Sequence, residues 1–198
     1  MRGRSRMRVS GLGLFVVAAL AAGCLGRSPA VQHYTLSPSG GGAGGADSEL
    51  AIGLGPVTLP DYLARNQLVT RRAGSEVEID ERSRWAGGFE SNVKETLADD
   101  LGARLGSDRV FLDPGLAPTP VAFQVSVDFR QFEGVDGEGV VLRARWIVRE
   151  RDGEKRIWSR ESTIRQETGG GVPGLVSAHD QALGRLADEI ATLIREAR

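Results

Sequence analysis

The sequence predicts a mixed α/β domain of the α+β type, in which a largely antiparallel sheet has two main helices packed on it. Three observations predict this fold. Apolar and polar residues alternate through residues 121–164, and apolar residues recur at helical spacing in two segments, 85–105 and 174–195. The elements therefore follow the order strands, helix, strands, helix, which is typical of a sheet with both helices packed against it.

The first strands open a single domain that is expected to span residues 49–198. Leu50–Val57 is short and apolar, and Pro60, whose ring removes a backbone donor, closes it. Gln67–Arg71 and Glu76–Asp80 flank an Ala-Gly-Ser tripeptide, which predicts a hairpin.

The first helix is predicted from apolar residues that recur every four positions. They are Trp85, Phe89, Val93, Leu97, Leu101 and Leu105. A strict four-residue step drifts about 40° around a helix each time, so the last four form the dependable buried stripe and Trp85 packs where the helix starts. Gly106 provides a C-terminal stop, and Asp99 and Asp100 are expected on the solvated face.

The second half of the domain is predicted to be three antiparallel strands and a helix. Odd positions are apolar in Val121–Phe129 and even positions in Val140–Val148, with Asp-Gly turns at 136–137 and 152–153. The last helix covers about Gly174–Arg195. His179 lies on its apolar stripe, so we expect a histidine packed between helix and sheet rather than a catalyst.

The N-terminus has the pattern of a secretory signal. Met1–Arg8 carries four arginines and no acid, and the apolar run Leu12–Ala22 that follows is too short to span a bilayer. The run ends in Leu-Ala-Ala-Gly-Cys, which resembles the bacterial lipobox, with residues 1–23 removed and Cys24 lipidated. The alternative is an ordinary secretory signal with a chance cysteine. Loss of the four arginines leaves the mature chain acidic, and its acyl chains anchor it to the membrane.

Residues 24–48 are expected to form a flexible, Gly-rich tether. Gly40–Gly45 is low in complexity, and only Val31–Leu36 suggests a short strand, with His33 exposed. Leu25, a residue other than Asp, follows the cysteine. In a Gram-negative cell this indicates export to the outer membrane, with the domain facing the periplasm.

Composition and spacing argue against several classes of chemistry. A single cysteine cannot form an intramolecular disulfide or a Cys-rich zinc site, and 25 basic against 26 acidic residues argue against nucleic acid as the main partner. Gly169–Gly174 fits the dinucleotide G-x-G-x-x-G pattern, but Pro173 interrupts the loop and no strand follows the helix to hold a ribose. His179 and Asp180 point about 100° apart on a helix and cannot act as a pair. We therefore expect no catalytic residue, no metal and no cofactor.

A row of basic residues is the stronger indication of a partner-binding surface. Arg143, Arg145 and Arg149 share one strand face, and Arg130, Arg160 and Arg165 join them if the strand register allows. Such a row could meet an acidic partner surface or lipid head groups. The favoured alternative is an exposed sheet face paired with Asp128, Glu161 and Glu167.

Five short segments resemble the ABC-type transport auxiliary lipoproteins, the PqiC-like family. They are Gly55–Leu63, Asn66–Val69, Arg84–Ala86, Phe132-Glu133 and Val141–Trp146. Leu59, Pro60, Asp61, Tyr62 and Leu63 form the most specific piece, and Trp85 and Trp146 are further motif positions. Tyr62 is either a partner anchor or a buried tyrosine with a satisfied hydroxyl, and we favour the second.

The resemblance implies a fold similar to anticodon-binding domains and a role without chemistry of its own. It implies a docking subunit in the outer membrane that works with an ABC permease, an ATPase and an MCE-domain protein. Such systems are thought to move phospholipids or other hydrophobic molecules between membranes. Tyr62, Arg143 and Arg145 are the candidate partner-binding residues, and a homo-oligomer remains open. The alternative is an outer-membrane assembly or structural lipoprotein without a transporter partner.

Overall fold

A computed structural model describes residues 30–40, 49–72, 74–112, 115, 117, 119–151 and 156–198. The chain divides into two units, Met1–Ala30 and Val31–Arg198, and the second holds all the elements below. Cys24, the expected signal peptide at 1–23 and most of the Gly-rich stretch lie outside the described residues.

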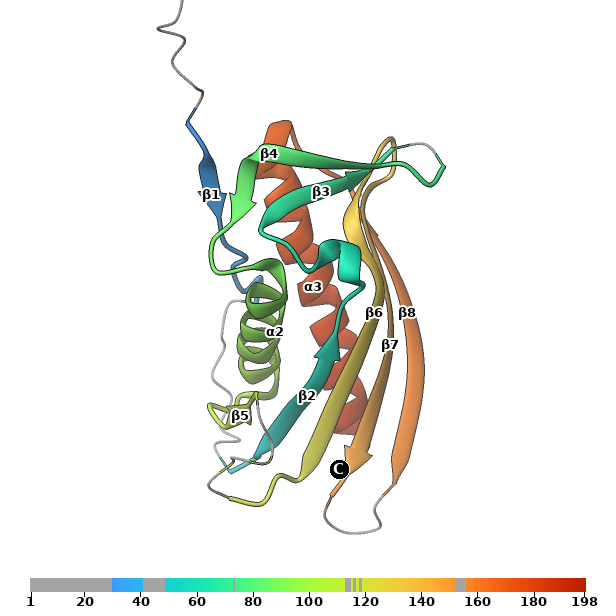
Figure 1. The fold of residues 1–198 in the computed structure, drawn as a ribbon. Helices are drawn as coiled ribbons and strands as arrows, with labels where there is room; N and C mark the ends of the chain where they lie inside the picture. Colours follow the sequence, from blue (N-terminus) through green and yellow to red (C-terminus); the bar gives the residue numbers. More distant parts are fainter. Residues whose placement is uncertain are drawn as a thin grey trace, which may run out of the picture. The chain divides into compact units, whose positions relative to one another are not determined.

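An eight-stranded sheet and two helices make up the described part of Val31–Arg198 (Figure 1). The strands are β1 Gln32–Tyr34, β2 Ile52–Thr58, β3 Gln67–Arg71, β4 Val77–Trp85, β5 Val110–Phe111, β6 Phe123–Val135, β7 Gly139–Glu150 and β8 Ile157–Gln166. The helices are α2 Phe89–Leu105 and α3 Gly171–Glu196, and η2 Asp61–Leu63 is a single 3-10 turn. The longest pairings are antiparallel, so the predicted mixed, largely antiparallel sheet is confirmed.

Strand β6 is the centre of the sheet. On one side it pairs along its whole length with β7, which pairs with β8. On the other side, β2 runs parallel to its first half, and β3 runs parallel to its last two residues. β3 and β4 form the predicted hairpin. The predicted three-stranded meander is therefore present, and it supports the remaining strands.

A bulge at Arg130 changes the alternation of β6. Phe129 pairs with Ala144, but the next pair is Gln131 with Arg143, so Arg130 is the extra residue. Phe132 consequently faces the helices together with Phe129, and Glu133 points to the opposite face. The predicted alternation holds as far as Phe129 and shifts by one position after it.

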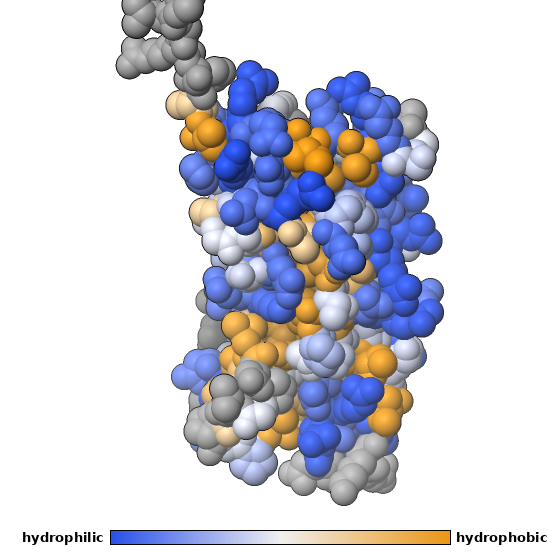
Figure 2. Space-filling model, in the orientation of Figure 1, coloured by the Kyte–Doolittle hydropathy of each residue, from blue (hydrophilic) through white to orange (hydrophobic). Residues whose placement is uncertain are grey.

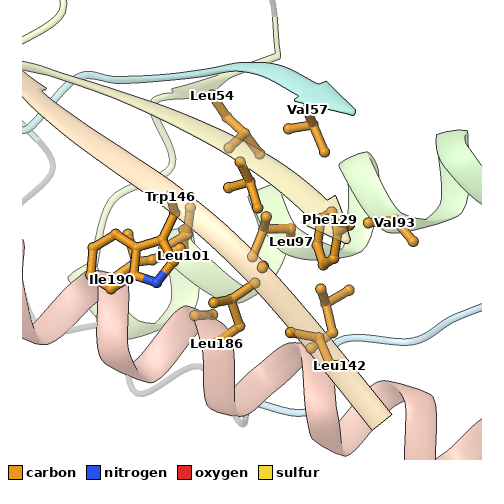
Figure 3. Packing of buried hydrophobic residues seen from close by; sticks show 14 of the residues in the cluster. Leu54, Val57, Val93, Leu97, Leu101, Phe129, Leu142, Trp146, Leu186 and Ile190 are labelled. Atoms are coloured by element: carbon orange, nitrogen blue, oxygen red, sulfur yellow. The ribbon is translucent and has the colours of Figure 1, made fainter. Parts of the chain in front are cut away.

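Both helices cover one face of the sheet and enclose the core. Figure 3 shows side chains from β2, α2, β6, β7 and α3 that point toward one another. The predicted stripe of α2 is confirmed, because Val93, Leu97 and Leu101 are completely buried. Gly106 ends α2 in a left-handed conformation with a φ of 65°, as its position predicts. On the face shown in Figure 2, apolar residues gather along the middle, where α2 meets β2, between hydrophilic borders.

Trp85 does not belong to the helix. It is the last residue of β4, and α2 begins at Phe89, after Gly87 and Gly88 with φ values of 78° and 92°. The two glycines supply the turn between strand and helix, because such backbone angles are costly for other residues. Trp85 still packs where the helix starts, since its ring stacks on Phe89 with centroids 4.8 Å apart.

Two further expectations need correction. Part of the expected tether is packed on the domain: β1 runs parallel to β4, and Leu36 is buried in the core. Asp100 is not on a solvated face but is completely buried, where it accepts hydrogen bonds from Ser39 and Gly40. A periodic pattern of apolar residues cannot reveal a carboxylate that is buried by a distant segment.

His179 is packed between α3 and the sheet, as its place on the apolar stripe predicts. It is 2% exposed, it contacts the rings of Trp85, Phe89 and Phe132, and its Nδ1 lies 2.8 Å from the Leu175 carbonyl oxygen. Burial lowers the pKa of His179 from 6.5 to about 4. The imidazole is therefore neutral at physiological pH and serves as a core aromatic group.

This pKa predicts an acid sensitivity. Because the pKa of His179 is lower in the folded than in the unfolded chain, its contribution to stability is complete above pH 6.5 and is lost as the pH falls toward 4. Urea unfolding at pH 7.5 and 4.5 should show that His179→Leu loses about 2 kcal/mol less stability across this interval than the wild type. His33→Leu, at an exposed position of β1, is the control. Equal losses in His179→Leu and wild type would contradict the assignment.

Candidate functional site

The motif segment 59–63 builds a polar cluster on the sheet face opposite the helices. η2 begins after Pro60 and presents Tyr62, whose hydroxyl donates to Oε2 of Glu133 at 2.8 Å. Nε of Arg71 donates to Oε1 of the same carboxylate at 2.7 Å, and its guanidinium lies 5.5 Å from the centre of the Tyr62 ring. The motif thus joins η2, β3 and β6 through one buried charge.

Glu133 is completely buried, and its charge is compensated on all sides. Besides Tyr62 and Arg71, it accepts hydrogen bonds from Nε2 of Gln131 at 3.2 Å and from the backbone N–H of Phe132 at 3.1 Å. A buried carboxylate with a cationic partner and several donors is tolerated. Loss of one partner is strongly destabilising, because the desolvation cost of the charge is then no longer compensated. Burial, followed by the neighbouring Glu133 carboxylate, raises the pKa of Tyr62 to about 12.

Tyr62 therefore has the arrangement that the sequence favoured, with its ring half-buried and its hydroxyl satisfied. Leu63 is buried, and Leu59 packs against the core from a partly buried position. Asp61 is exposed in the only turn of η2. Trp146 is buried, and its indole N–H donates to Ser162 at 2.8 Å. In this structure, the buried motif positions shape and hold the fold.

A pocket of about 790 Å³ borders this cluster where the β6–β7 turn, the β3–β4 hairpin and the start of α3 meet. Arg71 and Arg72 line it, but each is already paired with a carboxylate, Glu133 and Glu78 respectively. Three further carboxylates belong to the lining: Asp136, Glu138 and Glu167. The pocket is polar and carries surplus negative charge, so it suits neither a phosphate group nor an acyl chain.

The Gly-rich loop 169–174 lines this pocket and starts α3. Gly171 has a φ of 68°, and a side chain on Gly174 would come within 2.4 Å of the Gly169 backbone. The glycines therefore serve the close turn from β8 into α3. The pocket beside this loop is lined by carboxylates, which would repel the phosphates of a dinucleotide.

The basic row lies on the same face, on the adjoining strands. Arg143 and Arg145 are exposed on β7, opposite Gln131 and Asp128 of β6. Arg145 is paired with Glu161 at 2.6 Å. Among the described residues, Arg143 has no carboxylate partner. The register therefore leaves Arg143 as an exposed cation of the row, without an ion pair in the described part of the chain, while Arg149, the third arginine of the row, is half-buried opposite Gln124 of β6.

The other candidate arginines are divided by the register. Arg165 shares the face of the row and pairs with Glu138, and Arg130 pairs with Asp128. Arg160 lies opposite Trp146, on the helix-facing side of β8, and does not join the row. The expected paired sheet face is thus partly present, with Asp128 and Glu161 as the acids, while Glu167 lies at the pocket.

The remaining expectations concern metals, membrane spans and lipidation. Within the described ranges, no group of three or more His, Cys, Asp or Glu side chains is placed to hold a metal ion. None of the helices described there is long and apolar enough to cross a bilayer. Cys24, the expected lipidation site, lies outside the described residues.

A family model for the ABC-type transport auxiliary lipoprotein component matches residues 34–191, which include nearly every element described above. The chain belongs to this family. The match begins at Tyr34 in β1, inside the segment expected to be a tether. ABC-type transport auxiliary lipoproteins are components of transport systems and are not an enzyme family. No curated protein matches the chain.

Solved structures support the fold of the family. An uncharacterized protein superposes with a TM-score of 0.70 at 20% identity, over 84% of this chain and 99% of its own. Protein XCC0632 from Xanthomonas campestris superposes with a TM-score of 0.58 at 13% identity, over 81% of this chain and 91% of its own. At these identities the likeness shows the fold alone.

The polar cluster predicts a specific loss of stability. Tyr62→Phe removes one donor from buried Glu133 and keeps the ring, so it should lower the free energy of unfolding by about 1.5 kcal/mol. Tyr34→Phe is the matched control, because that hydroxyl donates to the exposed Gln32 side chain and, within the described residues, to no buried group. Urea unfolding measures the stability of both variants, and the comparison requires that their m-values equal that of the wild type. A Tyr62→Phe variant as stable as Tyr34→Phe would show that the hydroxyl contributes nothing.

Proposed function

We propose that this chain is an outer-membrane lipoprotein, anchored through Cys24, that docks an MCE-type ABC transport system in the periplasm. The family match over 34–191 carries the proposal, together with the single cysteine at the end of a signal-like segment. The transported molecules would be phospholipids or other hydrophobic substrates. The chain would act by binding, because the polar clusters of the described residues hold the fold together.

The docking face proposed here is the sheet face that carries Arg143 and Arg145, beside η2. Both helices cover the opposite face, so this one is open for a partner. Arg143 offers an unpaired cation, and Arg145 offers a second one that Glu161 partly neutralises. A partner with an acidic surface patch would fit it, since opposite charges speed association and set orientation.

Lipidation at Cys24 is tested by labelling cells with radioactive palmitate. The wild-type chain should take up label, and Cys24→Ser should take up none, because only a thiol at this position can receive the diacylglycerol group. When the membranes are fractionated, the Cys24→Ser variant should no longer be found in the outer-membrane fraction. Label retained by Cys24→Ser would defeat the lipid anchor.

The docking face is tested by reversing charge. Arg143→Glu should reduce recovery of the MCE-domain protein in a pull-down about tenfold or more, and adding Arg145→Glu should reduce it further, because both changes oppose an acidic partner. Arg160→Glu makes the same charge change on the other face of the sheet and is the matched control. Equal recovery with all variants would exclude this face.

The choice between a transporter subunit and a structural lipoprotein needs unbiased capture. Cross-linking of the full-length chain in native membranes should recover the MCE-domain protein or the ABC permease. Recovery of cell-wall or outer-membrane assembly proteins alone would favour the structural alternative. Tyr62→Ala adds a second readout: a folded variant that loses the MCE-domain protein would make Tyr62 a contact residue.

A further inference from the structure

The segment Leu36–Gly40, called here the N-terminal clip, follows β1 and lies against both helices. Figure 1 shows the chain passing from β1 along α2. Four backbone N–H groups of the clip donate to buried or partly buried side chains. They are Leu36 to Asn92 at 3.0 Å, Ser37 to Asp180 at 2.9 Å, and Ser39 and Gly40 to Asp100 at 3.1 and 3.0 Å.

These acceptors come from two different helices. Asn92 and Asp100 belong to α2, and Asp180 belongs to α3. Leu36 adds an apolar contact, since it is buried in the core. A segment that only passed over the surface would not satisfy its backbone donors with side chains so regularly.

The buried carboxylate of Asp100 depends on hydrogen-bond donors that the clip supplies. Asp100 is completely buried, and its Oδ1 receives Nη1 of Arg104 at 2.5 Å together with both clip amides. Arg104 also donates to Asp188 of α3 at 2.6 Å. Without the clip, Asp100 would lose two of its donors, and a buried carboxylate is costly when its donors are missing.

Gly184 shows that α3 accommodates the clip. A Cβ at this position would lie 1.7 Å from Oγ of Ser39 and 2.9 Å from Nη2 of Arg104. Gly184 is in the middle of a 26-residue helix, where glycine is unfavourable. The close approach of Ser39 explains why a side chain is absent there.

We propose that the N-terminal clip is a built attachment point that fastens the segment after Cys24 to the domain and limits the distance between the domain and the membrane. With β1 and the clip included, the folded domain begins at Gln32 instead of Glu49. Eight residue steps then separate Cys24 from the domain, at most about 28 Å, instead of about 85 Å for a tether that ends at Glu49. The distance from the membrane rests on the lipid anchor proposed above, whereas the attachment itself does not.

Amide hydrogen exchange of the full-length protein tests the attachment. Gly184→Ala should make the amides of Leu36, Ser37, Ser39 and Gly40 exchange at least tenfold faster and leave the sheet protected. Adding Ser39→Gly removes the obstructing side chain and should restore the protection, because the bonds to Asp100 come from the backbone. Gly170→Ala is the matched control, since a Cβ there meets nothing within 4 Å.

Two results would overturn the attachment. One is unchanged exchange of residues 36–40 in Gly184→Ala. The other is loss of protection throughout the sheet, because the clip would then be inseparable from the core and not an attachment of its own.

Energy transfer in vesicles tests the distance. A donor fluorophore is attached at Ser159→Cys, an exposed position of β8, and its energy transfer to an acceptor lipid in the vesicle is measured. Ten Gly/Ser residues inserted between Arg27 and Ser28 should lower the transfer, whereas the same insertion between Ala43 and Gly44 should leave it unchanged. Equal loss from both insertions would overturn the proposed distance. Failure of every variant to bind vesicles would reject the lipid anchor and with it the membrane distance, while hydrogen exchange still decides the attachment.

Discussion

The extra residue at Arg130 in β6 is the constraint on which the other contacts depend. It turns Phe132 toward the helices, where the rings of Phe89 and His179 contact it. Trp85 packs against those two rings in turn. It also turns Glu133 to the opposite face, where Tyr62 and Arg71 hold it. One bulge therefore connects the core with the motif segment, and a strand without it would exchange the faces of both residues.

Buried and partly buried carboxylates hold the irregular segments in place. Glu133 fixes η2 to the sheet, and Asp100 and Asp180 fix the residues that follow β1 to the helices. Burial raises the pKa of Asp180 to about 6. Regular strands satisfy their backbone groups among themselves, but a turn or an extended segment needs side-chain partners. These charges thus order parts of the chain that hydrophobic burial alone would leave undetermined.

Periodicity predicted the elements whose contacts are regular. The meander, the stripe of α2 and the place of His179 all follow from repeating burial of one face. Periodicity could not predict the bulge, because a one-residue shift leaves the composition unchanged. It could not predict Glu133 or Asp100 either, since the segments that bury them are distant in sequence. Trp85 lies four residues before Phe89, a helical spacing, although it ends a strand. The spacing is a coincidence, because a strand and a helix can both place an aromatic residue beside Phe89.

The parallel pairing of β1 with β4 also decides how the domain bears mechanical force. A pull directed along β1 from its N-terminal end would load its hydrogen bonds to Ser83–Trp85 in shear, all at the same time. The bonds of Leu36–Gly40 to the helices come later in the chain and carry load only after β1 has separated. The contact between α2 and α3 is therefore shielded twice from tension that arrives at the N-terminus.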